Sequence, residues 1–139
     1  MAPGAWPQEC HFRIQANDQM QYSTNHMLVP GSCSDIEVTL VNAGTQIAKI
    51  MGHNWVLSKP SDMRVIASAG LAAGFEHNWL APGDQRIIAA TRLVGGGESA
   101  SVHFSASVLH AGAEYSYFCS APGPYVTMHG RFLFGLAHP

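Results

Sequence analysis

Short runs of alternating apolar residues, separated by residues that favour turns, recur along most of this chain of 139 residues. A two-residue period is typical of strands that turn one face toward a core. The runs that show it are Phe12/Ile14, Ile36/Val38/Leu40, Ile87/Ala89, Val102/Phe104, Tyr115/Tyr117 and Phe132/Phe134/Leu136. Clusters of Asn, Asp, Pro and Gly lie between them. The pattern predicts an all-β protein, a sandwich or barrel of half-buried strands.

One segment departs from this period. The stretch from Ser61 to Ala69 follows Pro60 and ends at Gly70, which matches the start and stop signals of a helix. We therefore expect one short helix outside the sandwich. The stretch from Gly74 to Gly83 that comes after it is expected to be a connecting loop.

The size and charge of the chain limit what it can do. Its length predicts a single domain over residues 1–139. Only 12% of the residues are charged and the net charge is -2, which gives no basic surface for nucleic acid or an anionic membrane. The sequence holds no apolar run of 18 residues, so it predicts no membrane-spanning helix.

Three cysteines bear on the compartment. Cys10 and Cys33 flank what is interpreted as the first hairpin, whereas Cys119 lies far along the chain. This spacing favours a Cys10–Cys33 disulfide and one free thiol, which would require an oxidising compartment and thus a periplasmic mature protein. Three reduced, buried cysteines in a cytosolic protein are the alternative. The first residues lack the basic and apolar regions of a secretory signal, so either the chain is cytosolic or the signal is missing.

The segment from Cys119 to Met128 joins a thiolate donor to a thioether donor in one short loop between two predicted strands. His53, in Gly52-His53-Asn54-Trp55, offers an imidazole from a separate part of the chain. Thiolate, thioether and imidazole together suit copper, because the two sulfur ligands favour Cu(I) and imidazole serves both oxidation states. Each residue alone is more often structural, and only their combination predicts a copper site.

These two segments resemble the copper-binding segments of the azurins, which are type 1 blue copper proteins of the cupredoxin family. The loop of that group reads Cys, four residues, His, three residues, Met. The resemblance extends through Asn17 to Gln21, Met51 to Ser58 and Tyr117 to Cys119, and from Gly83 to Cys119 the register continues without a gap. It implies a Greek-key, cupredoxin-like sandwich, and the Cys10–Cys33 pair lies where the family has its disulfide.

The resemblance also implies a function and a ligand set. It implies an electron carrier, not an enzyme, with one copper ion held by His53, Cys119, a long axial Met128 and the Gly52 carbonyl. Asn54 and Phe118 are expected beside these ligands, and Trp55 is expected in the core. An apolar patch for redox partners is implied at Met20, Ile50, Met51, Leu71, Ala121, Pro122 and Val126.

Pro124 occupies the place where the family has its third equatorial ligand, a histidine, and proline offers no side-chain donor. Copper could still bind to the remaining ligands with that position open. Alternatively, a partner's histidine or a small external ligand could fill it, for storage, sensing or redox catalysis. Within the chain, His129 is expected to face away from Met128, and His138 is too far along an extended strand. No acid–base pair is visible beside the loop, which disfavours an enzyme.

Overall fold

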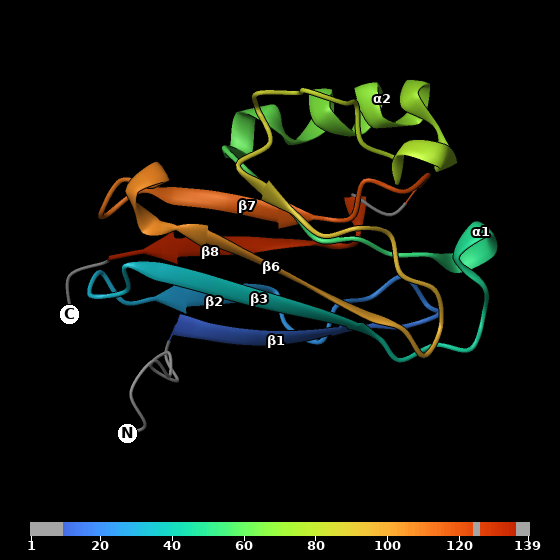
Figure 1. Cartoon of the computed structure of the whole chain (residues 1–139), viewed down its shortest axis with the longest axis horizontal. Coiled ribbons are helices and arrows are strands. Elements are labelled where there is room, and N and C mark those ends of the chain that lie inside the picture. The colour runs from blue at the N-terminus through green and yellow to red at the C-terminus, as the bar shows by residue number, and fades with distance from the viewer. Residues whose placement is uncertain (1–9, 124–125, 136–139) are drawn as a thin grey trace.

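The structure is a computed structural model that describes residues 10–123 and 126–135. Its strands form two sheets, which are layered face to face (Figure 1). The first sheet has the order β1-β3-β6, with β1 spanning His11–Ala16, β3 Asp35–Asn42 and β6 Ser99–Ser105. The second sheet has the order β2-β8-β7-β4-β5, with strands at His26–Val29, His129–Phe134, Glu114–Phe118, Val56–Ser58 and Ala89–Ala90. The predicted β-sandwich is confirmed.

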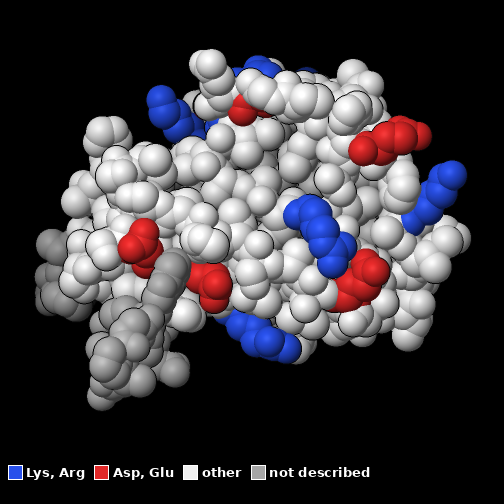
Figure 2. All heavy atoms as spheres, viewed as in Figure 1, with Lys and Arg blue, Asp and Glu red and all other residues white. Residues whose placement is uncertain are grey.

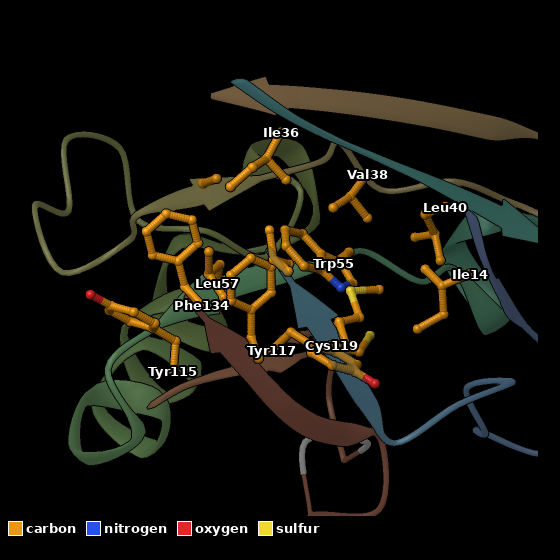
Figure 3. Packing of buried hydrophobic residues seen from close by; sticks show 14 of the residues in the cluster. Ile14, Ile36, Val38, Leu40, Trp55, Leu57, Tyr115, Tyr117, Cys119 and Phe134 are labelled. Carbon is orange, nitrogen blue, oxygen red and sulfur yellow. The ribbon is translucent and has the colours of Figure 1, made fainter. Parts of the chain in front are cut away.

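The core lies between the sheets. β3 alternates between buried and partly exposed residues, so that Ile36, Val38 and Leu40 point inward, as expected from the sequence. They face Trp55 and Tyr117 of the second sheet's side (Figure 3). Trp55 is fully buried and stacks on Tyr117 with ring centroids 5.9 Å apart, which agrees with its expected place in the core. Stacked and tilted aromatic pairs of this kind add to the stability gained from area burial alone.

The first two strands do not form a hairpin, so this part of the sequence interpretation is wrong. β1 pairs in parallel with β3, and β2 pairs in parallel with β8 in the other sheet. The chain crosses between the sheets after an isolated antiparallel bridge from Ala16 to Tyr22. Cys10 and Cys33 nevertheless form the predicted disulfide, because parallel pairing of β1 with β3 brings the starts of these strands together.

The predicted helix is present but its bounds differ. A 3-10 turn at Pro60–Asp62 leads into α2, Met63–Ala73, which passes through Gly70 and ends at Gly74 with a φ of 88°. A Cβ on Gly70 would lie 2.0 Å from the Trp79 carbonyl oxygen. Gly70 is therefore required by close packing and does not end the helix. The loop that follows contains a further 3-10 turn, Phe75–His77.

Two other strand expectations need correction. β7 is not half-buried, because Tyr115 to Phe118 are all buried; α2 covers its outer face with Ile66 and Ala67, which pack against Phe118 (Figure 1). The strand expected around Ile87 and Ala89 is shorter, since β5 begins only at Ala89.

A second short helix, α1, spans Ala48–Met51 and immediately precedes Gly52. In Figure 1 it lies at the same end of the sandwich as the chain that follows β7, away from the start of β1. No helix among the described residues is long and apolar enough to cross a membrane. The predictions that concern Pro124, Leu136 and His138 fall outside the described residues.

Candidate metal centre

Cys119 and His53 meet in the interior at this end of the sandwich. Cys119 directly follows β7, and His53 is held by an antiparallel bridge to Val94, with backbone hydrogen bonds of 3.0 and 2.8 Å. Both residues are fully buried. Their Sγ and Nδ1 atoms are 3.8 Å apart. The sequence predicted that these two side chains would come from independent segments to one place, and the structure brings them together.

This separation fits two ligands of one metal ion. A metal ion typically lies about 2.3 Å from a thiolate sulfur and about 2.05 Å from an imidazole nitrogen. With these bond lengths, the observed 3.8 Å between Cys119 Sγ and His53 Nδ1 corresponds to a sulfur–metal–nitrogen angle of about 120°. An angle near 120° between sulfur and nitrogen is that of the trigonal plane typical of blue copper centres, which add a weak axial methionine or backbone oxygen. The residues present therefore fit a copper ion.

The tautomer of His53 is fixed by its second nitrogen. Nε2 lies 2.7 Å from the Asn17 carbonyl oxygen, to which only an N–H can donate, so the unprotonated Nδ1 faces Cys119. Burial lowers the pKa of His53, against smaller opposing effects of the Asn17 carbonyl and Asp18. A neutral imidazole with its lone pair directed at the sulfur is the form that binds a metal.

The thiol of Cys119 is protonated at neutral pH when no metal is bound. Burial raises its pKa to about 11, although the backbone N–H groups of Asn54 and Ala121 donate toward the sulfur and oppose this shift. A metal cation binds thiolate and displaces the proton. The same two N–H groups would then stabilise the negative charge on the sulfur.

Asn54 braces the segments around the thiol. Its Nδ2 donates to the Asn78 carbonyl at 3.0 Å and to Ser120 Oγ at 2.8 Å, while its Oδ1 accepts from the Ser120 N–H at 2.9 Å. Ser120 Oγ in turn donates to the Trp79 carbonyl at 2.7 Å. This fully buried amide uses every polar atom of its side chain, which fixes the chain on both sides of Cys119.

Tyr22 adds a contact that the sequence interpretation missed. Its hydroxyl donates to the Asn54 carbonyl at 2.5 Å, and its ring packs against Tyr117 with centroids 5.6 Å apart. Burial, followed by the nearby Cys119 thiol, raises the pKa of Tyr22 well above its usual value. Tyr22 follows directly on the azurin-like segment Asn17 to Gln21, and that resemblance is the signal that could have drawn attention to it and to the Asn17 carbonyl.

The other two predicted ligands lie in the adjoining chain segments. Met128 is fully buried, and its carbonyl accepts a 3.1 Å hydrogen bond from the Cys119 N–H, which closes the base of the loop. Gly52 is also buried; a Cβ there would lie 2.4 Å from the Ala48 carbonyl oxygen and 2.9 Å from Leu93 Cγ. Only glycine permits the backbone before His53 to approach α1 this closely.

The remaining predicted neighbours lie further out. Phe118 packs beneath α2 in a different cluster from Cys119, so only its backbone adjoins the centre. His129 is exposed whereas Met128 is buried, in agreement with opposite faces. The other described histidines outside the centre are also exposed, namely His11, His26, His77, His103 and His110.

A cavity of about 210 Å³ opens beside the centre. Gly52, His53, Ala121 and Pro122 line it, so it touches both chain segments that carry the predicted ligands. Met20, Ile50 and Met51 line it as well. Of the remaining predicted patch residues, Leu71 is 50% and Val126 64% exposed, whereas Ala121 is buried. The face drawn in Figure 2 shows lysines, arginines and acidic residues interspersed, without a large cluster of one sign.

Comparisons with known proteins agree with this geometry. Residues 8–134 match the model of the family described as copper binding proteins, plastocyanin/azurin family. Azurin from Pseudomonas denitrificans is 45% identical over 122 residues, which cover 88% of this chain and 95% of that protein. Azurin from Pseudomonas aeruginosa PAO1 is 44% identical over 122 residues, 88% of this chain and 82% of that protein, and azurin iso-2 from Methylomonas sp. (strain J) is 42% identical over 121 residues, 87% and 94%.

A buried pair of sulfur and nitrogen donors at the end of a β-sandwich defines a copper protein of the cupredoxin type. The chain belongs to the plastocyanin/azurin family of copper-binding proteins. As the family implies, it is an electron carrier with one copper ion and not an enzyme.

Proposed function

We propose that the protein transfers single electrons through a type 1-like copper site with an incomplete ligand set. The observation that carries the proposal is the 3.8 Å approach of Cys119 Sγ to His53 Nδ1, with the lone pair of the imidazole directed at the sulfur. Met128 and the Gly52 carbonyl would complete the set of protein ligands as its weaker donors. A buried, braced pair of donors suits electron transfer, because the ligands barely move when copper changes its oxidation state.

Copper supplies the one-electron redox change, and the protein's residues set the conditions for it. The Asn17 carbonyl holds the His53 ring, and Asn54 holds the chain around Cys119, so neither ligand can follow the metal during the reaction. Both side chains are fully buried, so their neighbours in the fold hold them in place. The protein thereby keeps reorganisation small at these two positions.

The position of Pro124 is the part of the proposal that departs from the family. Proline cannot ligate copper, and the cavity beside Gly52 and His53 is far larger than the roughly 10–15 Å³ that a water molecule requires. We propose that the position is open, so that water or a small external ligand coordinates Cu(II), while Cu(I) tolerates the lower coordination number. The second candidate, a binding module completed by a partner's histidine, is favoured by the same cavity.

The proposed electron carrier also needs a surface for redox partners and a cellular location. Met20, Ile50, Met51, Leu71, Ala121, Pro122 and Val126 are proposed as an apolar patch on which redox proteins dock. Ile50 and Val126 are exposed members of this patch, at 66% and 64%. The Cys10–Cys33 disulfide requires an oxidising compartment, which supports a periplasmic location.

Copper reconstitution tests the proposal. Cu(II) added to the reduced, metal-free protein should produce intense thiolate-to-copper absorption in the visible spectrum, and imidazole should shift it toward that of a blue copper site. Pro124→His is the matched control, because a protein ligand in that position should make the spectrum insensitive to imidazole. Absorption that persists in Cys119→Ser would refute the ligand assignment.

The same experiment separates the two candidates. A carrier with an open position should remain monomeric on copper addition and show electron self-exchange that Pro124→His accelerates. A module that takes a histidine from a partner should instead form a complex whose spectrum no longer responds to imidazole. Size-exclusion chromatography of the copper-loaded protein distinguishes these outcomes.

A further inference from the structure

The outer face of the three-stranded sheet carries a row of possible metal ligands that the copper site does not use. In the register of the sheet, His11 of β1 is the partner of Glu37 of β3, and Glu37 is the partner of His103 of β6. Register partners point to the same face of a sheet. The burial pattern makes this the outer face, because the alternate residues of β3, such as Ile36 and Val38, are buried.

Two of the three side chains are already at the spacing of metal ligands. His11 Nδ1 and Glu37 Oε1 are 3.4 Å apart, longer than the about 2.7–2.9 Å of a charge-assisted hydrogen bond. Two ligands with bonds of about 2.0–2.1 Å to a tetrahedral ion would be separated by about 3.4 Å. An ion can therefore enter between this nitrogen and this oxygen without moving either strand.

The third side chain lies on the other side of Glu37. Neighbouring strands are about 4.8 Å apart, so the Cα atoms of His11 and His103 flank the central strand at a separation of roughly 10 Å. Among the residues that the structure describes, no group of three or more His, Cys, Asp or Glu side chains is already arranged to hold a metal ion. Binding therefore requires the exposed His103 ring to rotate toward Glu37 and to exchange the interaction that it makes in the metal-free protein for the metal ion.

We propose that His11, Glu37 and His103 bind a borderline divalent cation, Zn²⁺ or Cu²⁺, on the outer face of the sheet, with water completing its coordination. Two imidazoles and one carboxylate are a donor set that suits these ions better than Mg²⁺ or Ca²⁺. Among nearby charges on this face, Arg13 lies two residues from His11 and opposes the cation, whereas Asp35 lies two residues from Glu37 and favours it.

This site is separate from the candidate copper centre. His11 begins β1, while Asn17, whose carbonyl holds His53, directly follows the end of the strand. At about 3.3 Å per residue these two residues are roughly 20 Å apart. Neither the ligands nor the test of this site depends on how copper is bound.

Zn²⁺ titration of the ¹⁵N-labelled, metal-free protein, followed by NMR, tests the proposal site by site. We expect saturable shifts of the backbone amides around His11, Glu37 and His103. Any Zn²⁺ that enters the copper centre is reported separately by the amides near Cys119. Glu37→Gln and His103→Gln should each weaken the binding on the sheet at least tenfold, whereas His26→Gln, which removes an exposed histidine from the other sheet, should leave it unchanged.

Two results would overturn the inference: the absence of saturable shifts in β1, β3 and β6, or binding there that survives both substitutions. Each variant must first give the wild-type spectrum without Zn²⁺. If Glu37→Gln alters the fold, His11→Gln and His103→Gln still decide the question, because both replace exposed side chains.

Discussion

Replacing Tyr22 by phenylalanine removes one hydroxyl from the edge of the candidate copper centre and leaves the ring in place. That hydroxyl donates to the Asn54 carbonyl at 2.5 Å, and Asn54 is fully buried. The carbonyl cannot turn to water in the variant. An unsatisfied buried acceptor costs about 1–3 kcal/mol, which for a domain of this size lowers the melting temperature by about 4 °C per kcal/mol.

Tyr117→Phe is the matched control. Its hydroxyl also donates to a backbone carbonyl, that of Thr24 at 2.7 Å, and its ring contacts that of Tyr22. Thr24, however, is only partly buried, so water can replace the lost donor and the cost should be no more than about 1 kcal/mol.

Urea unfolding and the visible spectrum of the copper-loaded protein measure both effects. We expect Tyr22→Phe to be the less stable variant and to shift the thiolate-to-copper absorption, because the Asn54 N–H that donates toward Cys119 belongs to the same residue. Tyr117→Phe should leave that absorption unchanged. Equal loss of stability in the two variants, with no spectral change in either, would show that Tyr22 does not act on the site through Asn54.

Three further predictions concern the metal-free protein. Burial raises the pKa of Cys119 to about 11, whereas the thiol of the unfolded chain has a pKa of about 8.5, so the folded state loses stability as the pH rises between these two values. The free energy of unfolding, measured with urea, should therefore be roughly 2–3 kcal/mol lower at pH 10.5 than at pH 8, and this contribution should be missing in Cys119→Ala. Because burial lowers the pKa of His53, stability should fall as the pH drops below about 6.5, and His53→Gln should flatten this dependence between pH 7 and 5. Replacing Cys10 and Cys33 by alanine should cost about 3 kcal/mol in the same assay, and a loss below about 1 kcal/mol would contradict the role given to the disulfide.

The sequence predicted the strands best where one face is buried and the other is polar. β3 is such a strand, and its alternation is clear in the sequence. β4 has only three residues, all buried, so it shows no alternation to detect. β2 alternates in exposure, but its exposed residues include Leu28, which hides the pattern. A two-residue alternation of apolar and polar residues reveals a strand with one face in water. The alternation is absent where both faces of the strand are covered, and it is hidden where an apolar residue is exposed.

Contacts between segments that are distant in the sequence are the second feature that the sequence alone does not predict. Parallel pairing of β1 with β3 leaves no local signal, so the two cysteines that flank β1 and β2 were misinterpreted as flanking a hairpin. Gly70 likewise resembles a helix stop, although its role is to admit the Trp79 carbonyl from a later loop. The donor types of the metal centre could be predicted from sequence chemistry, whereas the Tyr22 contact depends on how the chain crosses between sheets.

The residue at position 124 does not determine how the two buried donors, His53 and Cys119, are oriented. His53 is oriented by the Asn17 carbonyl and Cys119 by Asn54, and neither contact involves the loop residue that differs from the family. Losing one donor should therefore change the coordination number of copper without displacing the other two ligands. With the proposed open position, the cavity beside Gly52 and His53 would admit a small external ligand to bound Cu(II). The protein would thereby couple electron transfer to the binding of a small molecule.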